Sequence, residues 1–370
     1  MKIAIVHDSL IRGGAERQAL YAVRELNKLG CDAELIYYNK APWPYDALGQ
    51  FGVSPTLVSK SGKRLRYPWK LAKHFRQRRF DVVHGFMAIP SVYATIAAAL
   101  AGVSTIFAGQ RVEYDARGVC KWIDRAVDRR VAGWIVNSMA SARALEKALN
   151  LSPGRTHVVY NGIDPSSLVP KRTRDDVRSQ LGIDRGAGVV AIVARLEPQK
   201  NHELFLYAAA ICRAARPSCR FLIVGDGPRR AELEALSRSL GLENDAGFLG
   251  NRSDIPDILA ATDISVLSSH YEGLSNVMLE AMGSGIPIVS TDYAGVDEVL
   301  TDGVDGFVVP LNDAEGLARR MVQLLDDADL RRRLGQAGRE SVCRRFTLDA
   351  MGRRLLRVYE SACGNVAQLT

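Results

Sequence analysis

Residues 264–283 read ISVLSSHYEGLSNVMLEAMG, which joins a short apolar run, a polar loop containing glycine and the start of an apolar helix. This pattern predicts a strand over Ile264–Leu267 whose loop leads into a helix, the repeating unit of a parallel sheet covered by helices. In open parallel sheets, ligands bind beyond the carboxyl ends of the strands, at the N-termini of the helices that follow. The loop in this stretch is therefore the first candidate for a functional site.

The same alternation of apolar runs and amphipathic helical stretches continues along the rest of the chain. The candidate strands are Ile3–Val6, Ala33–Tyr38, Val82–His84, Thr105–Ala108, Trp134–Val136, His157–Tyr160, Val189–Val193, Phe221–Val224, Ile264–Leu267, Ile286–Ser290 and Phe307–Val309. Residues 161–188 are polar, and we interpret them as the connection between two domains. The pattern predicts an α/β protein with Rossmann-like domains over residues 1–165 and 166–346, followed by a last helix in residues 347–370.

Length and composition agree with a two-domain globular protein. The chain has 370 residues, which is too long for one ordinary hydrophobic core. Hydrophobic residues make up 47% of it and charged residues 24%, as is usual for a soluble globular protein. No run reaches the roughly 18 apolar residues of a membrane span, and the N-terminus predicts a first strand in place of a signal peptide. The six cysteines form no Cys-x-x-Cys pair, which argues against a zinc site or a disulfide scaffold and favours a reducing cytosol.

The positive charge of the chain is concentrated in one segment. The formal net charge is +8, yet Lys60–Arg79 alone holds nine basic residues and no acidic one. Within this run Pro68 is placed to open a helix, with Leu71, Ala72 and Phe75 on the side that packs on the sheet. The run predicts an anionic surface or polymer as a partner.

Two glutamates in the opening stretch are candidate functional residues. Glu272 and Glu280 are eight positions apart; eight residues of helix rise about 12 Å, more than the roughly 5–9.5 Å between the paired carboxylates of glycosidases. They are therefore predicted to do different jobs. Glu280 stands in an apolar helix start and needs partners, which the two hydroxyls of a ribose would supply. The alternative is a buried glutamate bound to local backbone.

Two cations follow the first strand of the second domain. Arg195 and Lys200 flank a short turn, with no acidic residue paired obviously to either. Two cations at the carboxyl end of a strand suit a diphosphate, whose negative charge grows as it leaves. The alternative is a pair of ordinary surface cations.

Glycine-containing loops follow two further strands. Gly225 and Gly227 precede a helix, but a dinucleotide fingerprint requires a third glycine where Arg230 stands, so binding of NAD is not predicted. Gly13 and Gly14 open the first helix and would let the backbone approach an anion. For both loops the alternative is a plain tight turn into a helix.

Taken together, these loops resemble those of the retaining glycosyltransferases of family 4, which have the GT-B fold, and in particular those that build bacterial cell-surface polysaccharides. The resemblance covers essentially the whole chain. It rests on Arg195 with Lys200-Asn201, Gly225-Asp226-Gly227-Pro228, Glu272 and Glu280 with Ala281-Met282, Gly13-Gly14-Ala15-Glu16, Tyr160-Asn161-Gly162-Ile163-Asp164, and Phe346-Thr347.

The resemblance implies two Rossmann-like domains that face each other across a cleft, with the last helix packed back on the N-terminal domain. It implies a UDP- or GDP-sugar as donor, with no cofactor and no metal, because two cations take the metal's place. The only Asp-x-Asp, Asp327-Ala328-Asp329, is predicted to lie in a polar turn between helices.

The resemblance also assigns roles to single residues. Arg195 and Lys200 would hold the leaving diphosphate, and Glu280 the ribose hydroxyls. Glu272 with Gly273, Leu274, Ser275 and Asn276 would face the donor sugar and its phosphate, Gly225, Gly227, Leu249 and Gly250 would lie near the base, and Gly13 and Gly14 would close over the phosphates.

One position departs from the family pattern. Many members place a histidine after the strand that matches Thr105–Ala108, close to the sugar, whereas this chain reads Gly109-Gln110-Arg111. We expect Arg111 or His84 to take over part of that role. A histidine at a strand end is otherwise a structural residue.

The function implied is retaining, metal-independent transfer of a hexosyl or N-acetylhexosaminyl group to an acceptor glycan linked to a polyprenyl diphosphate. The enzyme would be cytoplasmic and peripheral to the inner membrane, binding its anionic surface through Lys60–Arg79, with Tyr67 and Trp69 at the lipid–water interface. The alternatives are a GT-B nucleotide-sugar epimerase and a nucleic-acid-binding protein that uses the same run. No RNA motif or recognition helix accompanies the run, so nucleic acid is not expected.

Overall fold

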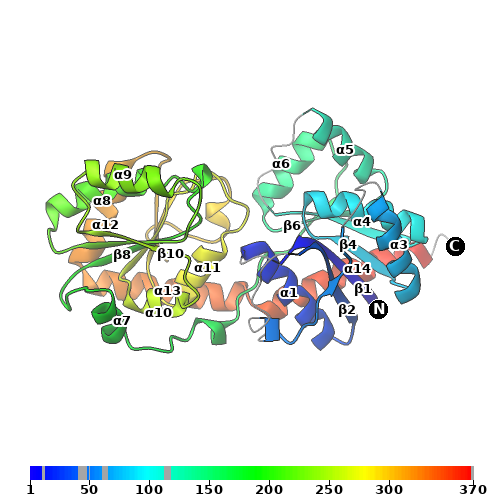
Figure 1. Ribbon diagram of the computed structural model, residues 1–370, viewed down its shortest axis with the longest axis horizontal. Coiled ribbons are helices and arrows are strands. Elements are labelled where there is room, and N and C mark those ends of the chain that lie inside the picture. Colours follow the sequence, from blue (N-terminus) through cyan, green and yellow to red (C-terminus); the bar gives the residue numbers. More distant parts are fainter. Residues whose placement is uncertain (11–12, 41–47, 50, 61–65, 112–117, 368–370) are drawn as a thin grey trace. The chain divides into compact units, whose positions relative to one another are not determined.

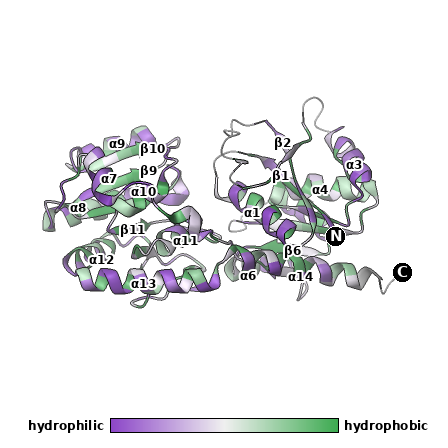
Figure 2. Cartoon of the chain, turned by 90° about the horizontal axis from the view of Figure 1, so that it is seen from below, coloured by the Kyte–Doolittle hydropathy of each residue, from purple (hydrophilic) through white to green (hydrophobic). Residues whose placement is uncertain are grey.

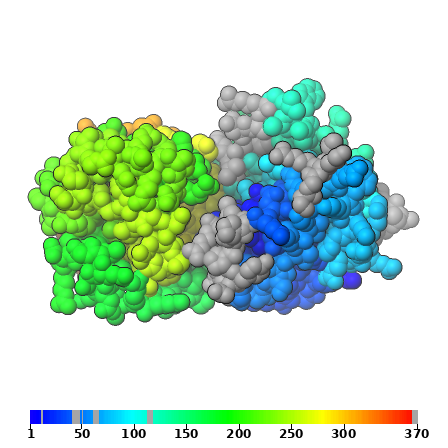
Figure 3. Space-filling model, viewed as in Figure 1, coloured from blue at the N-terminus to red at the C-terminus, as the bar shows by residue number. Residues whose placement is uncertain are grey.

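The computed structural model describes residues 1–10, 13–40, 48–49, 51–60, 66–111 and 118–367. The chain forms two compact units, Met1–Gly162 with Phe346–Thr370, and Ile163–Arg345. The first unit runs from blue to teal and ends in the red helix, and the second runs from green to orange (Figure 1). Figure 3 shows the blue-to-teal and green-to-yellow surfaces of the same two units. The division leaves Ile163–Pro165 with the second unit, whereas the sequence placed them in the first domain.

The first unit is built on a parallel sheet of strand order β3-β2-β1-β4-β5-β6-β7. The chain order reverses between β1 and β4, so the loops after these two strands open on the switch point. The strands are β1 (Lys2–Ser9), β2 (Asp32–Asn39), β3 (Thr56–Leu57), β4 (Val82–Gly85), β5 (Thr105–Gln110), β6 (Gly133–Val136) and β7 (Thr156–Val158).

Helices cover both faces of this sheet. On β1, Ile3 and Ile5 pack with α1 and α14, while Ala4 and Val6 face the core formed with α3, α4, α5 and α6. This alternation follows from the period of two along a strand. The helices are α1 (Gly14–Lys28), α3 (Tyr67–Arg78), α4 (Ala88–Ala101), α5 (Val119–Asp128), α6 (Met139–Leu149) and α14 (Leu348–Ala367).

The last helix, α14, belongs to the first unit, as the sequence predicted. It packs on α1, and Gly352 allows the close approach, since a Cβ at this position would lie 2.7 Å from Cβ of Glu25. Further along, the hydroxyl of Tyr359 lies 2.7 Å from Nδ1 of His84 at the end of β4. The C-terminal residues therefore complete the core of the N-terminal sheet.

The second unit has a parallel sheet of order β10-β9-β8-β11-β12-β13. Its switch point lies between β8 and β11. The strands are β8 (Val189–Val193), β9 (Arg220–Val224), β10 (Ala246–Gly250), β11 (Ile264–Leu267), β12 (Ile288–Thr291) and β13 (Phe307–Val309). The helices are η2 (Pro165–Leu168), α7 (Arg174–Gln180), η3 (Pro198–Lys200), α8 (His202–Ala215), α9 (Arg230–Ser239), α10 (Ile255–Ala261), α11 (Asn276–Gly283), η4 (Val296–Glu298), α12 (Ala314–Asp326) and α13 (Ala328–Arg345).

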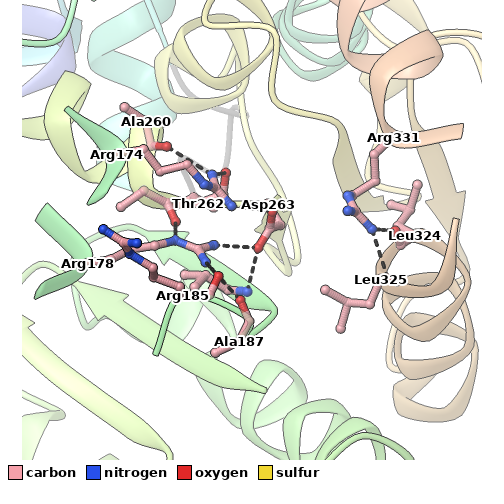
Figure 4. Close-up of polar contacts among 12 residues, drawn as sticks. Arg174, Arg178, Arg185, Ala187, Ala260, Thr262, Asp263, Leu324, Leu325 and Arg331 are labelled. Carbon is pink, nitrogen blue, oxygen red and sulfur yellow. Dashed lines mark hydrogen bonds and ion pairs between the residues drawn. The ribbon is translucent and has the colours of Figure 1, made fainter. Parts of the chain in front are cut away.

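The interpretation of residues 161–188 as a connection is wrong for most of its length. Helix α7 is part of the second unit, where Arg174 and Arg178 donate to the two carboxylate oxygens of Asp263, at 2.6 and 2.7 Å (Figure 4). Arg178 is buried, and its other donors reach backbone carbonyls. This polar segment has the composition of a linker, but Arg178 is buried and Arg174 half-buried, and both donate hydrogen bonds to Asp263.

Asp327 lies between α12 and α13, as predicted, whereas Asp329 lies in the first turn of α13, so the turn is shorter than the sequence indicated. The Asp327 carboxylate accepts a hydrogen bond from the amide of Leu330 at 2.8 Å, and Asp329 pairs with Arg332. These contacts account for both carboxylates. Over the part of the chain that the structure describes, no helix has both the length and the apolar composition needed to cross a bilayer.

Candidate active site

The predicted donor-site residues of the second unit gather at the carboxyl ends of β8 and β11, beside the switch point. The loop after β8 carries Arg195 and ends in η3 with Lys200, and the loop after β11 carries Glu272 and leads into α11. Parallel neighbouring strands bring these two loops together, which is where an open sheet binds its ligands.

The centre of this site is an ion pair between the two loops. Nζ of Lys200 lies 2.5 Å from Oε1 of Glu272, which also accepts the hydroxyl hydrogen bond of Ser269 at 2.7 Å. Glu272 is buried, so its charge requires such partners. The sequence-based expectation that neither cation has an acidic partner is wrong, because residues 72 positions apart in the chain meet here.

Arg195 is placed differently from Lys200. Its side chain is 69% exposed and pairs with the nearby Glu197 at 2.8 Å. An exposed pair of this kind contributes little to stability, and the guanidinium is free to exchange partners. Arg195 therefore offers an accessible cation at the same edge of the sheet.

Backbone contacts fix the two loops against each other. The amide of His270 donates to the carbonyl of Gln199 at 2.9 Å, and the Ser268 hydroxyl donates to the carbonyl of Lys200 at 2.8 Å. Gln199 returns a side-chain hydrogen bond to the carbonyl of Tyr271 at 2.7 Å. The position of the Lys200–Glu272 pair is thus determined by the main chain on both sides.

Helix α11 begins inside the same loop. Ser275 is its N-cap and accepts from the amide of Met278 at 3.4 Å. Leu274 and Ser275 are buried, and Glu280 is buried one turn further along, as the apolar run predicted. The N-terminus of α11 provides backbone donors beside Glu272, which suits an anionic group.

A third loop, after β12, also supports the site and was missed from sequence. Thr291 donates to the carbonyl of Ser269 at 2.7 Å. Tyr293 is buried, and its hydroxyl faces Sδ of Met278 at 3.9 Å. Burial, and then the negative charge of Glu272, raise the pKa of Tyr293 above its usual range. A lone tyrosine after a strand carries no sequence signal for this role.

Close backbone contacts explain why glycine occupies positions 225 and 227, after β9. A Cβ on Gly225 would lie 2.0 Å from the carbonyl oxygen of Ala194, and one on Gly227 would lie 2.6 Å from that of Leu196. The Gly225 amide donates to the carbonyl of Gly250 at 2.8 Å, so the end of β10 is fixed beside the loop that follows β9. The tight-turn alternative is therefore supported, and the predicted contact of these glycines and of Leu249 with a base stays a prediction.

Gly225→Ala is expected to destabilise the second unit. Gly225 has a φ of +135°, which side chains rarely adopt, and the added Cβ would collide with backbone. Strain of this kind costs about 1–3 kcal/mol. The free energy of unfolding in urea measures it, with Gly186→Ala as the matched control, because nothing lies within 4 Å of a Cβ at Gly186. Equal stability of the two variants would contradict the close approach.

His202, directly after the Lys200 turn, gives the second unit an acid-sensitive group. It is buried, and neither ring nitrogen has a hydrogen-bond partner in the described structure. Burial lowers the pKa of His202 to about 4. The unfolded chain therefore binds a proton that the folded one does not between about pH 6.5 and 4, so stability falls as pH drops through this window, by about 3 kcal/mol in all.

His202→Leu is expected to remove this part of the pH dependence, while the exposed His270→Asn should leave it unchanged. Urea unfolding at pH 7.5 and pH 4.5 tests the expectation. If His202→Leu loses as much stability on acidification as the wild type does, His202 is not the responsible group.

The first unit carries the remaining predicted residues. Gly13 caps α1 after β1, and a Cβ there would lie 2.2 Å from the carboxylate of Glu16. Gly14 is the first residue of the helix. The absence of a side chain at Gly13 therefore lets Glu16 fold back over the backbone, and the predicted role toward phosphate stays a prediction.

His84 and Arg111 are both buried at the carboxyl ends of β4 and β5. Burial lowers the pKa of His84 well below its usual value, so the ring that contacts Tyr359 is neutral. Arg111 donates to Oδ1 of Asn161 at 2.9 Å and stacks 3.7 Å from the ring centre of Phe86. Burial lowers the pKa of Arg111 to about 9. These contacts give His84 a structural role, and a role of either residue beside the sugar stays a prediction.

One cluster of metal-ligand type occurs within the described residues. Ligand atoms of His7, Asp8 and Glu16 lie within 4.8 Å of one another. Nδ1 of His7 already lies 2.8 Å from the Asp8 carboxylate and 3.0 Å from the carbonyl of Ser9. Local hydrogen bonds therefore account for this arrangement.

Helix α3 contains most of the described residues of the basic run. Its Leu71, Ala72 and Phe75 are buried on the sheet, as predicted. Tyr67 is also buried, so its predicted position at a lipid interface is wrong: its ring packs on those of Tyr38 and Tyr93. The cations that remain exposed are Arg66, Lys70, Lys73, Arg76, Arg78 and Arg79, and Trp69 and Gln77 are exposed too, while Lys63 and Arg64 lie outside the described residues.

Solved structures of known proteins share this fold. The Anabaena protein HepE, crystallised with UDP and glucose, aligns with a TM-score of 0.88 at 23% identity, over 98% of this chain and 100% of its own. WaaG, a glycosyltransferase involved in lipopolysaccharide biosynthesis, aligns with a TM-score of 0.75 at 18% identity, over 96% and 99%. The two parallel-sheet units have the GT-B fold of glycosyltransferases.

Sequence comparison identifies the family of the chain. The family model for glycosyl transferases group 1 matches residues 173–341, and that for Glycosyltransferase Family 4 matches residues 12–167. The chain belongs to glycosyltransferase family 4 and is a glycosyltransferase.

Curated relatives act on several sugars. An Escherichia coli UDP-Gal:alpha-D-GlcNAc-diphosphoundecaprenol alpha-1,3-galactosyltransferase is 29% identical over 88% of this chain and 89% of its own. A GDP-mannose-dependent mannosyltransferase of phosphatidylinositol monomannoside from Corynebacterium glutamicum is 28% identical over 79% of each chain. The lipopolysaccharide core glycosyltransferase LpsE of Rhizobium meliloti is 34% identical over 50% and 53%.

Proposed function

We propose that this protein transfers a hexosyl or N-acetylhexosaminyl group from a UDP- or GDP-sugar to a lipid-linked acceptor glycan in the synthesis of a bacterial surface polysaccharide or glycoconjugate. The observation that carries the proposal is the Lys200–Glu272 pair at the switch point, with the accessible Arg195 beside it. The chain thus presents two cations and a helix N-terminus where a diphosphate leaving group would develop its charge.

The chemistry proposed is retaining transfer without a metal. The bond between the anomeric carbon and the diphosphate oxygen breaks, and its electron pair leaves with the diphosphate. The acceptor hydroxyl attacks the same face of the sugar, and its proton passes to the leaving phosphate. Arg195 and Lys200 stabilise the departing charge, and Glu272 orients the ammonium of Lys200 through their 2.5 Å contact.

The names of the relatives support the donor and acceptor classes. The Escherichia coli relative uses UDP-Gal and an acceptor on diphosphoundecaprenol, and the Corynebacterium relative uses GDP-mannose and a phosphatidylinositol glycoside. Both acceptors are lipid-linked. This agreement favours a lipid-linked acceptor while leaving the base of the donor open between uridine and guanosine.

A panel of nucleotide sugars tests the proposal. Ligand binding raises apparent stability by RT ln(1 + [L]/Kd), so the true donor should give the largest shift in melting temperature. Product analysis by chromatography with and without acceptor then separates transfer from epimerisation, since an epimerase forms an epimerised sugar whether or not an acceptor is present. A chelator should have little effect, and complete inhibition that added metal rescues would contradict the metal-independent mechanism.

Contact with an anionic bilayer through the basic run is part of the same proposal. The exposed side of α3 carries Lys70 and Lys73 beside Trp69, whereas Arg78 is already paired with Asp32 and Glu34. Each cation near such a surface contributes about 1 kcal/mol. This contact is electrostatic and should weaken as salt is added.

A further inference from the structure

Helix α5 turns its apolar side outward. Trp122 and Ile123 follow Val119 by three and four positions, so all three share one side of the helix. Val119, Trp122 and Ile123 are 73%, 69% and 40% exposed, whereas the buried positions of the helix are Asp124 and Val127. Amphipathic helices of globular domains place their apolar stripe on the core. An apolar stripe that faces outward marks a surface with a further partner.

The neighbouring helix α4 extends this apolar surface. It contains no charged residue, and its outward positions include Ile89 and Ile96, which are 63% and 43% exposed. Helix α4 packs against both α3 and α5, and all three contribute to the core on the same face of the sheet. In Figure 2 α4 is largely white and green, beside the purple of α3. We call Ile89, Ile96, Val119, Trp122 and Ile123 the α4–α5 surface.

Positive charge borders the α4–α5 surface. Helix α3 lies on one side with Lys70 and Lys73, and α5 itself carries Lys121 and Arg125, whose guanidinium lies 5.6 Å from the ring centre of Trp122. Helices α3 to α6 are described throughout, and the acidic residues in them are Asp124, Asp128 and Glu146, none of which is exposed. The surface is therefore apolar at its centre and cationic at its rim.

We propose that the α4–α5 surface inserts its apolar side chains into the interfacial region of an anionic lipid bilayer, while the bordering lysines and arginines contact the headgroups. Charge decides between the occupants that an apolar surface could have. A second copy of the chain would place two cationic rims against each other, whereas anionic headgroups complement the rim. Tryptophan beside cations is the composition of helices that lie in the plane of a membrane.

The inference deepens the proposed function, because a lipid-linked acceptor requires the enzyme to reach the bilayer. It also adds a salt-resistant, apolar contribution to membrane binding that the basic run alone does not supply. Electrostatic contact through α3 should be lost at high salt, whereas insertion of the α4–α5 surface should keep part of the protein bound. Binding is therefore expected to have a salt-sensitive and a salt-resistant part.

Vesicle flotation tests the inference, with vesicles of phosphatidylcholine alone and of phosphatidylcholine mixed with phosphatidylglycerol. The triple variant Ile96→Ser/Trp122→Ser/Ile123→Ser is expected to lower partitioning onto the mixed vesicles by about tenfold or more and to abolish the salt-resistant part. The matched control is Tyr207→Ser/Ile211→Ser, which changes residues 46% and 43% exposed on the second unit. The control should float as the wild type does.

Tryptophan fluorescence adds a readout that does not depend on how well the triple variant folds. Brominated lipids should quench the wild type, and the conservative variant Trp122→Phe should lose the Trp122 part of this quenching and keep that of Trp69 while it still floats. Equal partitioning of the triple variant and the wild type, or unchanged quenching in Trp122→Phe, overturns the inference. A wild-type dimer that the triple variant dissociates would assign the surface to a second copy and overturn it too.

Failure of this inference is distinguishable from failure of the proposed function. Transfer to a water-soluble acceptor analogue should be the same in the wild type and in the triple variant, because none of the three residues belongs to the active site. If transfer occurs but neither protein floats, the proposed chemistry stands and the membrane surface does not. If the wild type floats and the triple variant does not, but no donor is used, the proposed chemistry fails alone.

Discussion

Alanine in place of Lys200 or of Arg195 is expected to lower turnover by about 10²–10³ in each case. Both cations stand at the carboxyl ends of β8 and β11, where the charge of a leaving diphosphate would develop, so their contribution is largest in the transition state. Initial rates at saturating donor measure the effect. Near-wild-type turnover in both variants would remove the diphosphate assignment.

The two variants should differ in stability. Lys200→Ala leaves the buried carboxylate of Glu272 without its closest partner and should lower the melting temperature, whereas Arg195→Ala breaks only an exposed pair. Arg319→Ala is the matched control, since Arg319 is as exposed as Arg195 and belongs to the same unit. Its turnover and melting temperature should both equal those of the wild type.

Much of the fold follows from the sequence because buried parallel strands are short continuous apolar runs. β8, β11 and β13 begin and end at the predicted residues. The strands that were missed stand at sheet edges: β3 has two residues, and β10 contains two glycines. Edge strands are half exposed, so their composition is less apolar and resembles that of a loop.

The site was predictable as a set of loops but not as a set of contacts. Topology alone places the residues after β8 and β11 together, at the carboxyl ends of these two neighbouring strands. The pairing of Lys200 with Glu272, and the support from Thr291 and Tyr293, depend on side chains that meet across long sequence separations. No local pattern encodes such contacts.

The amphipathicity of α5 shows a second limit of sequence reasoning. The spacing of Val119, Trp122 and Ile123 predicts an apolar stripe, but the stripe says nothing of whether it faces the core. Tyr67 shows the converse, since an aromatic residue within a basic run is buried among other tyrosines. Burial is settled by packing, and packing requires the structure.

Glu280→Ala is expected to lower the affinity for a nucleoside diphosphate by roughly 10- to 150-fold, which corresponds to about 1.5–3 kcal/mol for a charged hydrogen bond. Glu280 is buried on α11 beside the site, and the proposed partners of its carboxylate are the ribose hydroxyls. Calorimetric titration with UDP, with GDP and with a sugar phosphate that lacks the nucleoside measures the effect. Affinity for the sugar phosphate should change little.

A purely structural role for Glu280 predicts different effects of Glu280→Ala on the melting temperature and on nucleotide affinity. Loss of a buried glutamate that only binds local groups would lower the melting temperature without selective loss of the nucleotide. Glu280→Gln separates the two roles, because the amide keeps the volume and one hydrogen-bond acceptor but not the charge. This variant should melt close to the wild type and still bind nucleotide more weakly. If nucleoside diphosphate affinity is unchanged in Glu280→Ala, the carboxylate does not hold the ribose, and the base and phosphates must supply the affinity.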